Sequence, residues 1–175
     1  MSHRTIIRGD QIAQDDTWVY LDDEATPKNG ADVIVSLTRW IAQGDELSRR
    51  PSGRLGVVIE PDVDPEQLGQ IELFNLDLIA VRFPKFADGR GYSIARLLRE
   101  RHDWTKELRA TGEVLRDQLF FLRRVGFDVL EIAPREGIDP ASWLSALGDF
   151  GVVYQPSSDG AAPIYAHDRP SGPAS

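Results

Sequence analysis

From residue 32 onward, short apolar runs alternate with segments that carry helix signals, and this alternation limits the possible folds more than any other feature. Strand–helix alternation with short connections implies parallel strands joined by right-handed crossovers. We therefore expect an α/β fold with a mainly parallel sheet. An open sheet is favoured, although a partial barrel fits the same pattern. The expected strands are 33–35, 55–59, 78–83, 108–110, 127–132 and 152–154, and the expected helices begin near Ser36, Asp64, Ser93, Val114 and Asp139.

The two ends of the chain lie outside this alternation. Residues 5–8 and 17–21 are β-prone and flank a polar turn, which predicts an N-terminal hairpin. Fourteen of the last twenty residues are Pro, Gly, Ser or Ala, a composition that buries little apolar surface. The 175-residue length suits one domain. We expect a single domain over 1–155, with hairpin and connector over 1–31, and a flexible tail over 156–175.

Composition excludes several classes of chemistry. The chain has no cysteine, so disulfides, thiolate ligands and redox thiols are ruled out. The three histidines, at positions 3, 102 and 167, are too far apart to suggest a metal site, and no dinucleotide fingerprint is present. We expect no metal and no bound cofactor. Without a signal peptide or an apolar run of membrane-spanning length, the expected location is the cytoplasm, without membrane contact.

Charge is unevenly distributed along the chain. The formal net charge is −8, which argues against nucleic-acid binding. Residues 82–124 nevertheless contain eleven Lys or Arg against six Asp or Glu. This basic stretch is either a set of solvated helix faces or a surface for an anionic ligand or an acidic protein.

One long loop stands out beside the expected strand 78–83. In parallel sheets, ligands bind beyond the carboxyl ends of the strands, where helix N-termini present free N–H groups. Two glycines bracket an arginine in this loop, and a serine at the expected helix start can cap it. The loop therefore predicts an anion cradle, with a structural turn held by an ion pair as the alternative. The candidate contacts are Arg82, Lys85, Asp88, Arg90, Tyr92, Ser93 and, from the next strand, Arg109.

The expected helix 114–125 provides a second set of candidates. At about 100° per residue, Gln118 falls inside the apolar arc and needs hydrogen-bond partners. Phe120 falls on the opposite arc, beside Arg116 and Asp117. An aromatic ring among arginines on a solvent face suits a partner interface, although a lone exposed ring is also common. Asp88 and Asp117 could serve as acid or base, but no nucleophile motif accompanies them, and enzymatic activity stays open.

Two runs carry a family resemblance: FPKFADGRGYSIARLLRER at 83–101 and ELRATGEVLRDQL at 107–119. They closely resemble a bacterial family catalogued as domain of unknown function nine-three-four, over a range from about Trp18 to Gln155. Members are often labelled oxidoreductases, and their genes often lie beside those for sirohaem sulfite reductase. The resemblance implies a role in assimilatory sulfate reduction, whereas nothing in these residues supports the oxidoreductase label.

Three functions remain after these exclusions. The first is an accessory protein that docks on a sulfite reductase hemoprotein or another sulfate-assimilation enzyme, with the basic stretch and Phe120 as its docking face. The second is a small enzyme or binding protein for an anionic sulfur or nucleotide metabolite, such as an oxyanion held by Arg82, Arg90 and Arg109. The third, a purely structural domain, has no feature in its favour.

Overall fold

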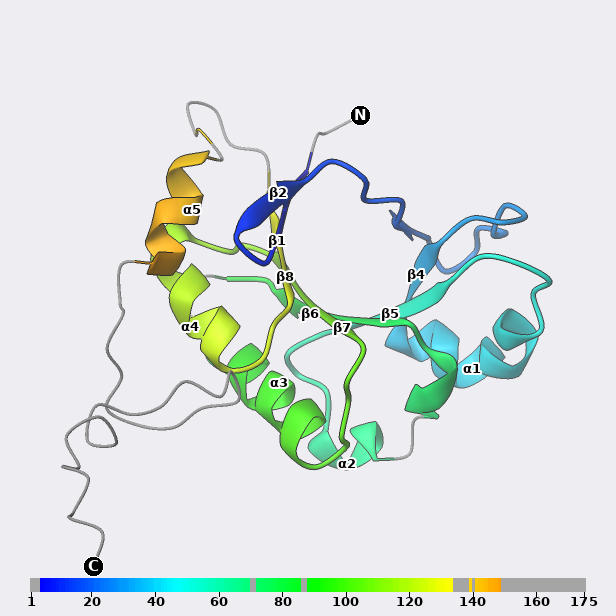
Figure 1. The fold of residues 1–175 in the computed structure, drawn as a ribbon. Coiled ribbons are helices and arrows are strands. Elements are labelled where there is room, and N and C mark those ends of the chain that lie inside the picture. The colour runs from blue at the N-terminus through cyan, green and yellow to red at the C-terminus, as the bar shows by residue number, and fades with distance from the viewer. Residues whose placement is uncertain (1–3, 70–71, 86–87, 134–138, 140, 149–175) are drawn as a thin grey trace, which may run out of the picture.

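The computed structural model describes residues 4–69, 72–85, 88–133, 139 and 141–148. Over these residues the chain forms eight strands, five α-helices and two 3₁₀ turns (Figure 1). The expected strand 152–154 and tail 156–175 lie outside the described residues. The elements are β1 (Thr5–Arg8), β2 (Gln11–Ala13), β3 (Val19–Tyr20), β4 (Val33–Ser36), α1 (Leu37–Ser48), β5 (Leu55–Ile59), α2 (Pro65–Leu68), η1 (Leu73–Asn75), β6 (Leu78–Phe83), α3 (Arg90–Glu100), β7 (Glu107–Gly112), η2 (Arg116–Gln118), α4 (Leu119–Arg124), β8 (Val129–Ile132) and α5 (Ala141–Gly148).

The strands form one open, curled sheet in the order β2-β1-β8-β7-β6-β5-β4-β3. From β3 to β8 every strand lies parallel to the one before it in the chain. Only β1 and β2, at one edge, are antiparallel to their neighbours. The mainly parallel sheet is therefore confirmed. β5 and β6 span the two apolar runs expected from the sequence.

The expected hairpin is wrong in its second strand. β1 pairs with β2, and Arg8 lies opposite Gln11, so that Gly9 and Asp10 form a two-residue turn. Gly9 adopts φ +62°, which a glycine accommodates without strain in such a turn. Residues 19–20 form β3 instead, at the opposite edge of the sheet, parallel to β4. The local turn decides the hairpin partner, because it closes the shortest loop.

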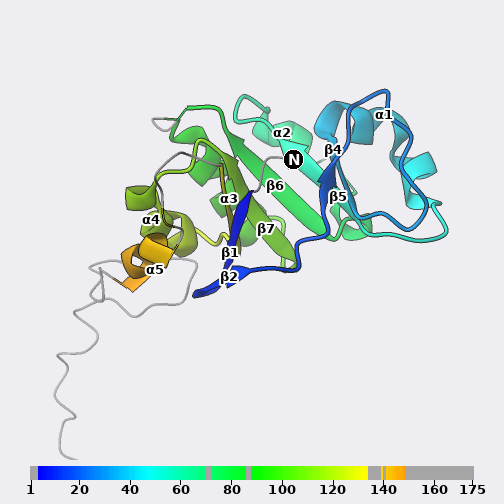
Figure 2. The same cartoon turned by 90° about the horizontal axis from the view of Figure 1, so that it is seen from above.

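The helices pack on one face of the sheet and enclose the main core (Figure 2). Trp40 and Leu47 of α1, Ile94 and Leu98 of α3 and Leu122 of α4 are all buried there. Alternate strand residues face the same core, because successive side chains of a strand point to opposite faces. α1 begins where its cap predicts: the Ser36 hydroxyl accepts a hydrogen bond from the Arg39 N–H at 3.0 Å.

Two helices differ from their expected ranges. α3 begins at Arg90, three residues before Ser93, so Ser93 is not its N-cap. The expected helix 114–125 is shorter: Leu115 is extended, and η2 precedes α4. A 3₁₀ turn advances the chain by about 120° per residue, which shifts the phase of the helical wheel. On the expected helix, Phe121 would share the apolar arc with Gln118, but in the structure it is 51% exposed. Phe120, assigned to the solvent side, is half-buried.

The connection from β2 to β3 crosses the sheet face opposite the helices, because these strands are the two edges. We call residues 14–18 the strap. Its last residue, Trp18, is buried in a second, smaller apolar cluster with Ile34, Val58 and Leu78. The strap therefore fills the concave face of the curled sheet. None of the helices in the described ranges is long and apolar enough to cross a membrane.

Candidate functional site

The loop after β6 is held close to the sheet by its glycine and its aromatic residues. A Cβ atom on Gly91 would lie 2.5 Å from Phe83 Cζ, so the first turn of α3 packs directly on the Phe83 ring. Tyr92 contacts the same ring edge-to-face, with a centroid distance of 5.5 Å. Burial, aided by the charge of Asp117, raises the pKa of the half-buried Tyr92 phenol. This packing places the start of α3 at the carboxyl ends of β5 and β6.

Asp88 and Arg90 form an ion pair, as expected for the structural turn that was the alternative to an anion cradle. The Asp88 carboxylate accepts hydrogen bonds from Arg90 Nε at 2.9 Å and from Arg90 Nη2 at 2.7 Å. It also accepts one from the Arg90 backbone N–H at 3.2 Å. The Arg90 side chain holds the pKa of Asp88 below its ordinary value, and Asp88 raises the pKa of Arg90. The pair thus stabilises the first turn of α3 and fixes the direction of the guanidinium.

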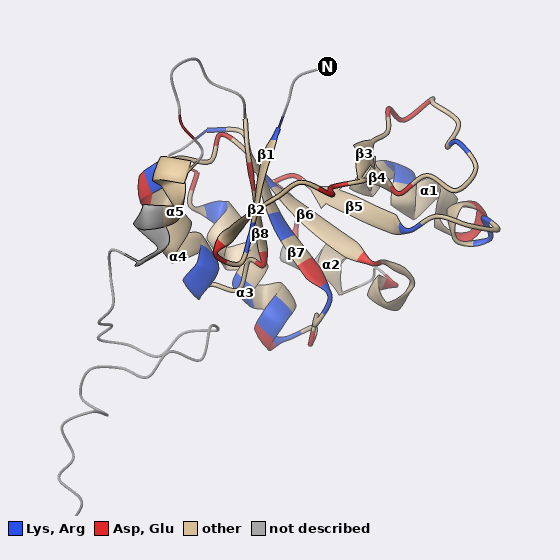
Figure 3. Cartoon of the chain, turned by 45° about the horizontal axis from the view of Figure 1, so that its top comes forward, with Lys and Arg blue, Asp and Glu red and all other residues tan. Residues whose placement is uncertain are grey.

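A pocket of about 580 Å³ opens between α3 and the loop after β5. That volume lies within the range of pockets that bind small molecules, about 300–1,000 Å³. Its apolar part comes from both walls, and its charged part combines three arginines with two carboxylates. Figure 3 colours Lys and Arg blue, and the blue segments of α3 mark its arginines. The lining residues are Pro61, Asp62, Val63, Arg90, Ser93, Ile94, Arg96, Leu97, Glu100 and Arg101.

The three arginines of this pocket differ in their partners. Arg90 is paired with Asp88, and Arg96 Nε lies 2.8 Å from Glu100 Oε1, one helical turn along α3. Arg101 forms no ion pair or hydrogen bond through its side chain within the described residues. It is exposed at the end of α3. The pocket therefore offers one cation that needs no displacement of a protein carboxylate before it can bind an anion.

Two further cradle candidates are placed nearby but outside the pocket lining. Arg82 Nε forms an ion pair with Glu60 Oε1 at 2.9 Å, which ties the end of β6 to the end of β5. Lys85 is exposed in the loop before α3. Of the sequence candidates, the structure thus brings Arg90 and Ser93 into one pocket, with Arg82 and Lys85 at its periphery.

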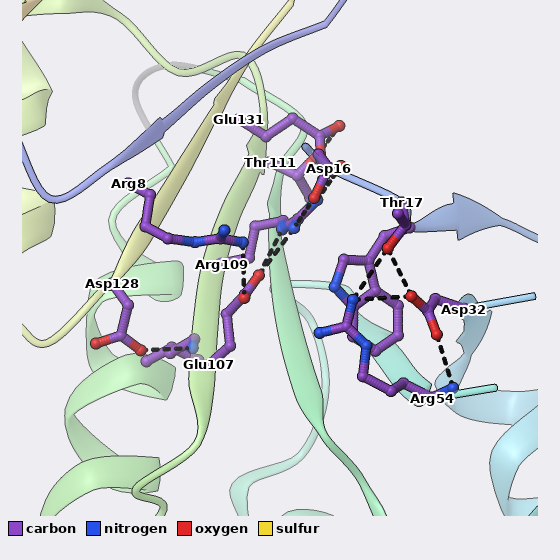
Figure 4. Close-up of polar contacts among 12 residues, drawn as sticks. Arg8, Asp16, Thr17, Asp32, Arg54, Glu107, Arg109, Thr111, Asp128 and Glu131 are labelled. Atoms are coloured by element: carbon purple, nitrogen blue, oxygen red, sulfur yellow. Dashed lines mark hydrogen bonds and ion pairs between the residues drawn. The ribbon is translucent and has the colours of Figure 1, made fainter. Parts of the chain in front are cut away.

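The prediction that Arg109 is a contact of the anion cradle is wrong. It lies in the middle of β7, opposite Ala80, and its side chain is 0% exposed. Its guanidinium donates to Asp16 of the strap at 2.6 and 3.1 Å, and to Glu107 and Glu131 at 2.8 and 3.2 Å (Figure 4). The N–H groups of this guanidinium all donate to three protein carboxylates, so none remains for an external anion.

The network around Arg109 continues through Glu131. This carboxylate also accepts hydrogen bonds from the hydroxyls of Tyr20 at 3.0 Å and Thr111 at 3.1 Å. Burial, together with the negative charge of Glu131, raises the pKa of Tyr20 well above its ordinary value. Burial alone would lower the pKa of Arg109, but hydrogen bonds to Asp16 and Glu107 raise it overall. Arg109 therefore stays charged, and its hydrogen bonds to Asp16 hold the strap on the sheet.

Sequence reasoning missed the carboxylates of this network. Glu107 and Arg109 lie two positions apart in one strand, so their side chains point to the same face of the sheet. This spacing could have predicted their ion pair. Asp16 has no such signal, because it reaches Arg109 across 93 positions of sequence.

The α4 candidates form a separate, mostly structural group. The Gln118 side chain accepts a hydrogen bond from the Leu115 N–H at 3.0 Å and so finds the partner that its position required. Arg116 Nε donates to the Ser142 carbonyl at 3.1 Å and connects η2 to α5. Asp117 is exposed. Phe120 contacts Phe121 edge-to-face, at a centroid distance of 5.5 Å, and lies under Arg124. The half-buried Phe120 is thus less suited to anchor a partner than its exposed neighbour.

Comparison with known protein families gives a match. A family model with the description "Bacterial protein of unknown function (DUF934)" matches residues 56–165, which is more than half of the chain. The matched range contains both runs, 83–101 and 107–119, that carried the resemblance, as well as the pocket beside α3. No curated protein matches the chain.

Proposed function

We propose that this chain, which belongs to the bacterial DUF934 family, binds an anionic metabolite in the pocket between α3 and the loop after β5. The observation that carries the proposal is the composition of that pocket. Three arginines line a space large enough for a mononucleotide-sized ligand, and one of them, Arg101, has no protein partner within the described residues. Guanidinium groups are the preferred protein ligands of phosphate and sulfate oxygens.

The apolar walls favour a ligand with more than a bare oxyanion. Ile94 is buried at the base of the pocket, and Val63 and Leu97 are half-buried beside it. A free sulfate ion would leave this surface in water, whereas a nucleotide could cover it with its base and ribose. The role in sulfate assimilation that the family resemblance implies makes adenylyl sulfate the first ligand to test.

Two carboxylates temper the positive charge of the site. Asp62 and Glu100 line the same pocket, so the arginines exceed the acids by only one. Because Glu100 is already paired with Arg96, a bound anion gains most from Arg101. This arrangement favours reversible binding, and it presents no histidine or hydroxyl–base pair among the lining residues for nucleophilic catalysis.

Isothermal titration with adenylyl sulfate tests the proposal. The wild type should bind at micromolar concentration, and Arg101→Gln should weaken binding about tenfold, the cost of one charge-assisted hydrogen bond. Lys28→Gln is the matched control, because it removes the same charge from an exposed position outside the lining. Equal loss in both variants, or no binding by the wild type of adenylyl sulfate, ATP or phosphate, contradicts the proposal.

A second candidate function is docking on a sirohaem sulfite reductase or another enzyme of sulfate assimilation. It is favoured by three large apolar side chains on helical elements that stay exposed: Ile41 at 64%, Phe74 at 72% and Phe121 at 51%. Co-purification of the chain with the sulfite reductase hemoprotein of the same bacterium tests it. A complex that survives gel filtration supports docking, and two separate peaks at micromolar concentration contradict it.

A further inference from the structure

We infer that the groove between α1 and η1 is a docking surface for a partner protein that presents a basic residue beside apolar ones. The groove shares no lining residue with the pocket beside α3, so this inference stands apart from the proposed anion binding. It would supply a surface for the second candidate function, but it does not depend on which enzyme the partner is.

The shape of the groove suits a protein side chain. Its volume is about 250 Å³, below the roughly 300–1,000 Å³ of pockets that enclose a small molecule. The ring of Trp40 forms part of its wall, and a Cβ atom on Gly44 would lie 3.3 Å from that ring. An indole face and a glycine thus create a shallow, rigid hollow on α1.

Two large exposed apolar residues belong to the elements that form this hollow. Ile41 lines it from α1 and is 64% exposed. Phe74 is 72% exposed and lies in η1 between Glu72 and Asn75, both of which line the groove. One exposed apolar residue needs no explanation, but two large ones beside one hollow resemble the centre of a protein interface.

The charges of the groove determine what can cover it. Asp45 and Glu72 line it, and the described residues of the lining include no Lys or Arg. Neither carboxylate forms an ion pair within the described part of the chain; Glu72 accepts only a long amide hydrogen bond from Asn75 at 3.4 Å. Complementary charge across an interface steers association and excludes wrong partners. Two unneutralised carboxylates beside apolar side chains therefore match Lys or Arg beside apolar side chains.

The same carboxylates argue against other occupants. A two-fold symmetric dimer would bring this patch against itself and set Asp45 and Glu72 against like charges. Nucleic acids and anionic lipid surfaces would be repelled for the same reason. A separate, basic partner is the occupant that the charges favour.

Three fluorescein-labelled dodecapeptides provide the probe: one of Leu and Arg, one of Leu and Glu, and one of Ser and Arg. Fluorescence anisotropy should show saturable binding of the Leu–Arg peptide alone. Phe74→Ala should weaken it at least about fivefold, and Asp45→Asn with Glu72→Gln at least about tenfold. Glu113→Gln removes a charge from an exposed position outside the groove and should change the affinity less than twofold. Circular dichroism spectra should be the same for each variant and the wild type, which checks that the variants are folded.

Three outcomes overturn the inference. Equal binding of the Leu–Arg and Ser–Arg peptides would show attraction by net charge alone. Binding that survives all groove substitutions would place the peptide elsewhere. A concentration-dependent oligomer of the wild type that Phe74→Ala abolishes would show that a second copy of the chain occupies the groove.

Discussion

The carboxylate of Asp16 accepts two hydrogen bonds from the guanidinium of Arg109, at 2.6 and 3.1 Å, although 93 positions separate the two residues. One residue lies in the strap and the other in the centre of β7. Their pairing joins a central strand of the parallel sheet to the strap that crosses the sheet face opposite the helices. Without the strap, the buried Arg109 would lack its bidentate partner.

Substitution of Arg109 should destabilise the fold strongly. Arg109→Met removes the buried cation shared by three carboxylates: Asp16 loses its arginine partner, while Glu107 and Glu131 keep only the partly exposed Arg8 and Arg4. Breaking such a buried network costs about 3–5 kcal/mol. Urea unfolding measures the loss. Arg96→Met, at an exposed pair with Glu100, is the control and should cost no more than about 0.5 kcal/mol. A loss below about 1 kcal/mol for Arg109→Met would show that the network is not buried in solution.

Substitution of Asp16 should loosen the strap before it unfolds the sheet. Asp16→Asn keeps the side-chain shape but removes the charge from the bidentate pair, so hydrogen exchange at residues 14–18 should accelerate about tenfold or more. Asp15→Asn is the matched control, because Asp15 is 82% exposed and reaches only Arg8, at 3.8 Å. Exchange that rises equally throughout β6 and β7 would mean global unfolding and would contradict a local role.

The two glycines around Arg90 should respond differently to alanine. At Gly91 the new Cβ meets the Phe83 ring at 2.5 Å, so Gly91→Ala should lower the free energy of unfolding by about 1–3 kcal/mol. At Gly89 nothing lies within 4 Å and φ is −72°. Gly89→Ala should therefore be neutral or stabilise by up to about 1 kcal/mol. Thermal unfolding compares them, and a reversed order would show that α3 does not pack on Phe83 as described.

Asp32 should contribute an acid-sensitive part of the stability. Hydrogen bonds from the Arg54 side chain, with help from Thr17, hold the pKa of Asp32 far below its ordinary value. A carboxyl whose pKa is lower in the folded state stabilises the fold above its unfolded pKa, near 3.9, and this contribution disappears as the pH falls toward the folded pKa. The stability gap between wild type and Asp32→Asn should thus be largest at pH 7 and shrink below pH 4.

The size of that gap is limited by solvent. Arg54 is 52% exposed, so screening reduces its contribution and we expect a gap of about 1 kcal/mol at pH 7. Urea unfolding between pH 7 and pH 3 measures it. Arg54→Gln removes the cation of the same ion pair and should flatten the pH dependence of the stability as Asp32→Asn does. A gap that stays constant across this range would place the Asp32 titration outside the folding equilibrium.

Local signals in the chain were sufficient for most elements. β5 and β6 could be predicted from two continuous apolar runs, which are typical of strands buried on both faces. Ser36 marks the start of α1 through its hydroxyl, and Gly126, at φ +107°, follows the end of α4. Arg90 and Ser93, predicted as contacts of an anion cradle because they follow a strand end, line the pocket beside α3. Each of these features depends only on neighbours within a few positions.

By itself, then, the sequence determined the strand–helix alternation and the direction of the parallel strands. Tertiary structure alone decided the hairpin partner of β1, the burial of Arg109 and the exposure of Phe121 rather than Phe120. The physical reason is the range of the interactions. Periodicity and capping act between adjacent turns, whereas the pairing of Asp16 with Arg109 exists only once the sheet has curled and brought distant segments together.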